Sequence, residues 1–128
     1  MNRLLETVLS MESIDMAKVI HKIAVPAIGE TGKDLICSSF GRCPFIIIYE
    51  ADSEKYTAYV NPGASLLDGS GLKATEVILQ NNADILLTLE IGKKAYSVLR
   101  KENVDVQLLK SGGTVKAVIN KFIKEIEE

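Results

Sequence analysis

Three short segments of this 128-residue chain combine glycine with serine, threonine or lysine just before a helix-forming pattern. They are Gly69-Ser70-Gly71, Ile91-Gly92-Lys93-Lys94 and Ser111-Gly112-Gly113-Thr114. The first turn of a helix has backbone N–H groups without intrahelical partners and carries the positive end of the helix dipole. We expect the three segments to converge on one edge of a sheet, where they would suit an anionic ligand. The alternative, that these residues only shape turns and helix caps, is left open.

Two cysteines, Cys37 and Cys43, flank residues 38–42. Two thiolates cannot complete a four-ligand zinc or iron–sulfur site, although a dimer could supply four. The alternative is that Cys43, which precedes Pro44 and a hydrophobic run, is a small buried residue. His21 is the only histidine, so neither a histidine cluster nor a nucleophile with an obvious base can be drawn. Metal ligation by Cys43 and Cys37 is therefore one hypothesis, and hydrolytic chemistry is disfavoured.

Two glycine patterns resemble nucleotide-binding motifs but lack the context that such motifs need. Residues 69–74 match a relaxed dinucleotide fingerprint, but residues 62–68 separate them from the preceding strand. Residues 29–34 are not a phosphate-binding loop, because Ala27 stands in place of the first glycine and Asp34 in place of the magnesium-binding Ser or Thr. The acidic residues lie mostly in loops or at strand ends and form no catalytic pair. The sequence therefore indicates a protein that is not an enzyme.

Composition and charge limit the remaining functions. Apolar residues make up 47% of the chain and charged residues 25%, as in ordinary globular proteins, so one hydrophobic core can form without disulfides or metal. The net charge of −2 gives no basic surface of the kind that nucleic-acid binding requires. The longest apolar run, residues 45–49, is far shorter than a membrane span, and no secretory signal is recognised. We therefore expect a cytoplasmic protein with reduced thiols and no membrane or nucleic-acid partner.

The apolar pattern predicts an α/β domain preceded by an arm. Residues 1–21 are expected to form a helical or flexible arm, and residues 22–128 a single domain. Within the domain the pattern predicts a short strand stopped by Pro26, a hairpin, and then alternating helices and strands. The expected strands are residues 22–26, 44–50, 55–61, 84–89 and 104–109, and the expected helices are residues 71–82, a segment around 95–99, and residues 115–126. Short connections of this kind require parallel strands, so we expect a mixed five-stranded sheet with helices packed on it.

Several of these segments resemble the dinitrogenase iron–molybdenum cofactor biosynthesis family. The resemblance lies in Ile23-Ala24-Val25-Pro26, Ser39-Phe40-Gly41-Arg42-Cys43-Pro44-Phe45, Asn61, Gly69-Ser70-Gly71 and Ile91-Gly92, and it runs from about Ile23 to the C-terminus. Phe-Gly-Arg before a hydrophobic strand is its most specific part. The resemblance implies a ribonuclease H-like sheet without nuclease activity, in nitrogenase accessory proteins that carry or help assemble iron–molybdenum cofactor or other metal–sulfur clusters. Relatives that hold a cofactor often have histidine before Phe-Gly-Arg or in the loop before the glycine-rich helix start, whereas this chain has none at either place.

The residues and the resemblance together predict a non-enzymatic carrier or assembly protein for an anionic metal–sulfur cluster of the iron–molybdenum or iron–sulfur type. Folding is not expected to require the cluster. The alternative is a protein–protein interaction module of the same fold that has lost the cofactor site and works through its arm or a homodimer face. Arg42 would neutralise ligand charge, and Cys43 could ligate metal. The predicted ligand-binding residues are Ser39, Phe40, Gly41, Arg42, Cys43, Gly69, Ser70, Gly71 and Gly92.

Overall fold

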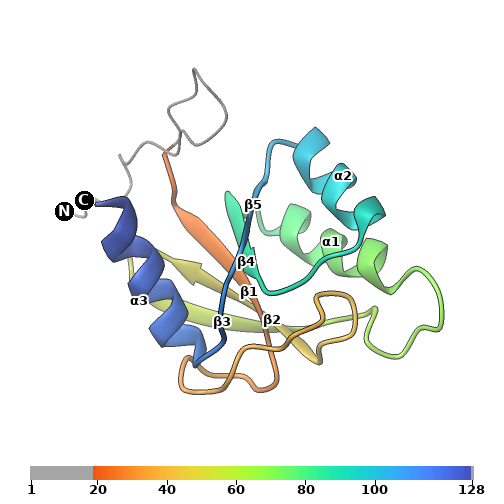
Figure 1. Ribbon diagram of the computed structural model, residues 1–128, viewed down its shortest axis with the longest axis horizontal. Coiled ribbons are helices and arrows are strands. Elements are labelled where there is room, and N and C mark those ends of the chain that lie inside the picture. The colour runs from red at the N-terminus through yellow and green to blue at the C-terminus, as the bar shows by residue number, and fades with distance from the viewer. Residues whose placement is uncertain (1–18, 128) are drawn as a thin grey trace.

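The computed structural model describes residues 19–127, which form a five-stranded sheet flanked by three helices (Figure 1). The strands are β1 (Lys22–Ala27), β2 (Phe45–Glu50), β3 (Lys55–Val60), β4 (Ile85–Thr88) and β5 (Asp105–Leu108). The helices are α1 (Ser70–Gln80), α2 (Lys93–Lys101) and α3 (Val115–Ile126). The strands lie in the order β3-β2-β1-β4-β5. None of these helices is long and apolar enough to cross a membrane.

The strand directions follow from the lengths of the connections. A turn at residues 51–54 joins β2 to β3, and the two strands pair antiparallel, which confirms the predicted hairpin. β1 pairs antiparallel with β2 but parallel with β4, and β4 pairs parallel with β5. Parallel neighbours need crossover connections, and α1 and α2 provide them. The predicted ribonuclease H-like mixed sheet is therefore confirmed, with most element ends within two residues of those expected.

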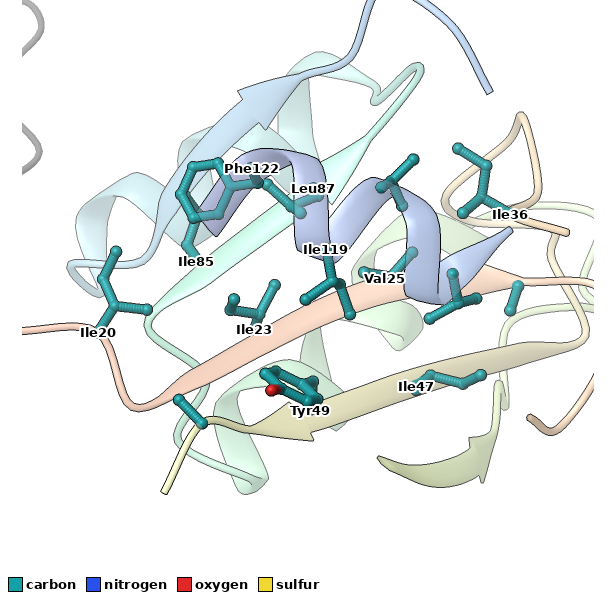
Figure 2. Close-up of a cluster of buried hydrophobic side chains, with 14 residues drawn as sticks. Ile20, Ile23, Val25, Ile36, Ile47, Tyr49, Ile85, Leu87, Ile119 and Phe122 are labelled. Atoms are coloured by element: carbon teal, nitrogen blue, oxygen red, sulfur yellow. The ribbon is translucent and has the colours of Figure 1, made fainter. Parts of the chain in front are cut away.

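Different helices cover the two faces of the sheet, because successive residues of a strand point to opposite faces. On one face α3 packs over a core that includes Val25 and Ile47 (Figure 2). On the other face α1 and α2 pack over a core that includes Ile46 and Leu86. All four of these strand residues are completely buried. Figure 1 shows α1 and α2 together on the side of the sheet away from α3, so their first turns begin near one another.

β1 differs from the prediction at its end, because the strand continues through Pro26 by one residue. Pro26 lies in register with Ile46 of β2, and its carbonyl accepts a hydrogen bond from the Cys37 backbone N–H. On the other side, β4 pairs with β1 only at Ile23 and Ala24. Pairing with β4 has ended before Pro26, so a residue without an amide hydrogen is tolerated there. The prediction that Pro26 stops the strand was wrong.

The expected arm lies almost entirely outside the described residues, which begin at Val19. One residue that was assigned to the arm, Ile20, is only 3% exposed and belongs to the core under α3, as Figure 2 shows. The expected division of the chain into residues 1–21 and 22–128 stays a prediction. Ile20, however, packs with the domain rather than apart from it.

Removing residues 1–19 is expected to leave the domain folded, because Ile20 and every described strand and helix remain. The far-ultraviolet circular dichroism and the cooperative thermal melt should match those of the full chain. Removing Ile20 as well is the matched control, and the loss of this buried side chain should lower the free energy of unfolding by about 1–3 kcal/mol. A chain of residues 20–128 that is insoluble, or melts without cooperativity, would show that the first nineteen residues belong to the core.

Candidate ligand pocket

A pocket of about 610 Å³ opens at one edge of the sheet, where the first turns of α1 and α2 meet. Three segments line it, residues 39–42, 67–72 and 90–95. The first follows β1, the second leads from β3 into α1, and the third leads from β4 into α2. β1, β3 and β4 run in the same direction, so their C-terminal ends share this edge. In open α/β sheets this edge is where ligands bind.

The structure brings most of the predicted binding residues to this pocket. Those that line it are Ser39, Phe40, Gly41, Arg42, Gly69, Ser70, Gly71 and Gly92. A short parallel bridge between Ser39 and Glu90 holds the 39–42 segment beside the end of β4. The Phe40 side chain is 2% exposed and fixes the same segment in the core under α1 and α2. Among the predicted binding residues, Cys43 alone does not line the pocket.

Glycines allow the pocket wall to approach the start of α1. A Cβ atom at Gly41 would stand 2.8 Å from the Gly71 backbone nitrogen and 2.8 Å from Ser70 Oγ. A Cβ atom at Gly63 would collide with the Ser70 carbonyl oxygen. Gly69, at the N-cap of α1, has a φ of +77°, which residues with side chains rarely adopt. The first turn of α1 is therefore held in place by close backbone contacts that only glycine permits.

α1 and α2 both begin at the pocket without a side-chain cap. Gly69 and Gly92 occupy the N-cap positions, and neither N-cap provides a side-chain hydrogen bond to the first N–H groups of its helix. The first N–H groups of a helix have no intrahelical partners. Residues 70–72 and 93–95 line the pocket, so they supply amide donors and two positive helix-dipole ends to it. Such an arrangement favours an anionic ligand.

The third glycine segment follows β5, which runs parallel to β4 and ends at the same edge of the sheet, but this segment does not line the pocket. Thr114 caps α3, because its side chain accepts a hydrogen bond from the Ala117 N–H at 3.1 Å. The carbonyls of Gly32 and Asp34, in the loop after β1, accept the N–H groups of the first two residues of α3. The N–H groups at the start of α3 are thus already paired within the protein. α3 also covers the opposite face of the sheet.

Arg42 holds the loop that leads into α1. Its Nη1 donates to the Leu66 carbonyl at 2.6 Å, and its Nη2 donates to the Leu67 carbonyl at 2.9 Å. The Arg42 side chain is exposed and lines the pocket. Arg42 therefore places a positive charge at the pocket and fixes one of its walls. Neutralisation of ligand charge by Arg42 stays a prediction.

Asn61 joins the pocket wall to the loop before α1, a role that the sequence reasoning missed. The residue is 2% exposed. Its Nδ2 donates to the carbonyls of Gly41 and Cys43 at 3.1 and 2.8 Å, and its Oδ1 accepts the Gly63 N–H at 2.9 Å. The Asn61 backbone N–H donates to the Pro44 carbonyl at 2.9 Å. The signals in the sequence are the family resemblance, which includes Asn61, and a polar residue placed directly between a strand and a Pro-Gly turn.

Cys43 is buried behind the pocket wall. It is 0% exposed, and its single S–H can donate to the carbonyl of Phe40 or to that of Phe45, whose oxygens lie 3.2 and 3.3 Å from Sγ. Burial, and next the charge of the neighbouring Cys37, raises the pKa of the Cys43 thiol to about 12. A thiol that keeps its proton is a poor metal ligand. Within residues 19–127, no three His, Cys, Asp or Glu side chains are grouped to hold a metal ion. Metal ligation by Cys37 and Cys43 stays a prediction, and this geometry does not favour it.

Two cations in the pocket were not among the predicted site residues. Lys93 and Lys94 are exposed in the first turn of α2 and, with Arg42, give the pocket three positive side chains. Asp68 and Glu90 contribute two carboxylates to the same lining. The signal for the lysines was available, because they directly follow Gly92 in a predicted helix start.

Comparison with solved structures finds the same fold in several other proteins. The apo form of the orange protein from Desulfovibrio gigas is 28% identical, with a TM-score of 0.77, over 85% of this chain and 92% of that chain. A NifB-like protein from Thermotoga is 25% identical, with a TM-score of 0.72, over 82% of this chain and 89% of that chain. A dinitrogenase-like protein from Methanocaldococcus jannaschii, 17% identical with a TM-score of 0.59, shares the fold over 84% of this chain and 91% of that chain. No curated protein sequence matches the chain.

The family model described as dinitrogenase iron–molybdenum cofactor matches residues 21–125, which include every described strand and all but the last residue of α3. This match agrees with the segments in which the sequence resembles the family. The chain therefore belongs to the dinitrogenase iron–molybdenum cofactor family.

Proposed function

We propose that this chain binds an anionic metal–sulfur cluster, of the iron–molybdenum or iron–sulfur type, as cargo and carries it without catalysing a reaction. The observation that carries the proposal is the pocket between two helix starts that have no side-chain caps. Membership of the family supports a cofactor-related role. We place the carrier in the cytoplasm, where exposed metal–sulfur clusters and reduced thiols are compatible.

The donor set of the pocket fits an anion held by hydrogen bonds better than a metal held by protein ligands. The backbone N–H groups of residues 70–72 and 93–95 can donate to the outer sulfur atoms of a cluster. Arg42, Lys93 and Lys94 offset its negative charge, whereas Cys43 is buried behind the wall, and burial raises the pKa of its thiol. A pocket of about 610 Å³ is large enough for a small cluster. Cargo held without protein–metal bonds can be released intact, which a carrier requires.

The pocket is built by one chain, so cargo binding does not depend on a homodimer. The alternative function is an interaction module of the same fold that has lost its ligand. These two functions differ in one measurable property, because the interaction module has no affinity for an anion at the starts of α1 and α2.

An Arg42→Ala chain is expected to bind tetrathiomolybdate, a molybdenum–sulfur dianion, more weakly than the native chain by about 1.5–3 kcal/mol. The substitution removes a cation and the two hydrogen bonds that hold the loop at Leu66 and Leu67. Anaerobic titration followed by absorbance measures the affinity. Arg42→Lys should recover part of the loss, because it keeps the charge but not the paired hydrogen bonds.

Lys55→Ala, at the start of β3 and outside the pocket lining, is the matched control and should bind as the native chain does. Unchanged affinity in a folded Arg42→Ala chain would contradict this placement of the ligand. If Arg42→Ala instead melts early and its remaining folded fraction binds normally, Arg42 has only a structural role.

Removal of metal is expected to leave the fold intact. The two cores on either face of the sheet are built from buried apolar side chains, and no described group of metal-ligating residues links the elements. Circular dichroism and the thermal melt in excess chelator should equal those of the untreated chain. Loss of the helical signal on chelation would show that metal is part of the folded structure.

A further inference from the structure

The two cysteines lie together at the base of the pocket wall. Cys37 and Cys43 bracket residues 38–42, and Cys37 packs against the core cluster that contains Cys43. The Cys37 thiol is near enough to raise the pKa of the Cys43 thiol, after burial, which is the larger cause. Both residues also bond to the Ser39 carbonyl, which accepts from Cys37 Sγ at 3.7 Å and from the Cys43 N–H at 3.1 Å. Neither cysteine lines the pocket.

We propose that Cys37 and Cys43 are a reversible disulfide site, in which an intramolecular bond closes a ring around residues 38–42 and makes the pocket wall responsive to oxidation. Residues 39–42 of this ring line the pocket. An effect of oxidation on cargo binding rests on the proposed function, whereas formation of the disulfide does not.

The chemistry requires an oxidant, and a small-molecule disulfide is sufficient. Cys37 is half-buried and Cys43 is fully buried, so the oxidant meets Cys37 first. The Cys37 thiolate attacks one sulfur of the oxidant, the oxidant S–S bond breaks, and one small thiol leaves. The Cys43 sulfur then attacks Cys37 Sγ, the mixed disulfide breaks, and the second small thiol leaves with the proton that Cys43 gives up. Two protein thiols are oxidised to one disulfide while one small disulfide is reduced to two thiols.

The environment of Cys43 makes this order of events specific. Cys43 is 0% exposed, so solvent oxidants do not reach it, and the sulfur that it can attack is that of Cys37, which packs against the same core cluster. Burial also raises the pKa of the Cys43 thiol, so the thiol gives up its proton only during that attack. Reductants reach this disulfide through the Cys37 sulfur, and the chain has no other cysteine. Such a disulfide suits reversible regulation rather than permanent stabilisation.

Oxidation would change the contacts that shape the wall. In the reduced protein the single hydrogen of the Cys43 thiol can be donated to the carbonyl of Phe40 or of Phe45, and a disulfide sulfur has no hydrogen to donate. The Phe40 carbonyl keeps only the 3.4 Å contact with Asn61 Nδ2. Gly41, the next residue, touches the first turn of α1. Movement at Phe40 is therefore transmitted to the wall and to the helix start that forms the pocket.

The test treats the reduced full chain with oxidised glutathione, stops the reaction with acid, and measures intact mass and free thiols. The native chain is expected to become lighter by two hydrogens and to retain no free thiol. Its oligomeric state should be the same in the oxidised and the reduced samples, and dithiothreitol should restore the starting mass. Cys43→Ala should stop at the glutathione adduct on Cys37, and Cys37→Ser should stay reduced. A native chain that stops at the adduct with Cys43 still free, or that forms disulfides between chains, would overturn the proposal.

Amide NMR spectra of the reduced and oxidised native chain measure the effect on the pocket without any cargo. Amide shifts are expected at residues 39–42 and in the first turn of α1, with none in the last turn of α3. Shifts confined to the two cysteines would refute the link to the pocket. Because this readout uses no anion, failure of the disulfide and failure of the proposed function are separate results.

Discussion

An Asn61→Ala chain is expected to lose about 3 kcal/mol of unfolding free energy. The substitution removes the donor that serves the carbonyls of Gly41 and Cys43 and the acceptor that serves the Gly63 N–H, and the Asn61 side chain that supplies both is 2% exposed. Each buried polar group that loses its partner costs about 1–3 kcal/mol, partly offset where the neighbouring backbone relaxes. Urea unfolding followed by circular dichroism measures the change.

Two matched variants separate this network from a general effect of substitution. Asn120→Ala, on the exposed surface of α3, should change the unfolding free energy by less than about 0.5 kcal/mol. Asn61→Asp keeps the side-chain shape but places a carboxylate against carbonyl oxygens, so at neutral pH it should be at least as destabilising as Asn61→Ala. An Asn61→Ala chain as stable as the native protein would contradict the role given to this residue.

A Gly41→Ala chain is expected to lose about 2 kcal/mol of stability and to bind anions at least about tenfold more weakly. The added Cβ would lie 2.8 Å from the Gly71 nitrogen and from Ser70 Oγ, so either the wall or the first turn of α1 must move. The displaced contact is with an amide that the ligand is proposed to use. Thermal melting and tetrathiomolybdate titration measure the two effects.

Gly112→Ala is the control for Gly41→Ala. The nearest atom to a Cβ at Gly112 is Ile36 Cγ1 at 3.9 Å, and Gly112 lies outside the pocket lining. This variant should melt at or slightly above the native temperature and bind normally. Equal losses of affinity in both variants would mean that glycine substitutions act on the whole fold and say nothing about the pocket.

Most of the fold could be predicted from the sequence, because its elements have strong local signals. The 44–61 hairpin is two β-rich runs around a polar turn, and α3 has apolar residues at helical spacing from Val115 to Ile126. The predicted end of β1 was wrong, and the reason is not local. Whether Pro26 can remain in a strand depends on where β4 stops pairing, and that register is set by the whole sheet.

The pocket could be predicted only in part. The glycine segments at Gly69 and Gly92 mark helix starts by themselves, and the sheet order brings them together. The start of α3 has the same composition but lies on the other face and bonds to the loop after β1. Asn61 shows the same limit, because the carbonyls of Gly41 and Cys43 that accept from it are 20 and 18 residues away in the sequence. Local sequence identifies helix starts, but tertiary contacts decide which of them remain open to a ligand.

Amide NMR during an anaerobic titration with tetrathiomolybdate shows whether the uncapped starts of α1 and α2 bind an anionic metal–sulfur cargo. Saturable amide shifts are expected at residues 70–72 and 93–95, with smaller changes at residues 41–42. Residues 115–117 should give constant signals, because their N–H groups are already paired. Absence of shifts at residues 70–72 and 93–95, or shifts centred instead on the groove between β5 and α3 around Gly112, would contradict binding of the cargo at these two helix starts.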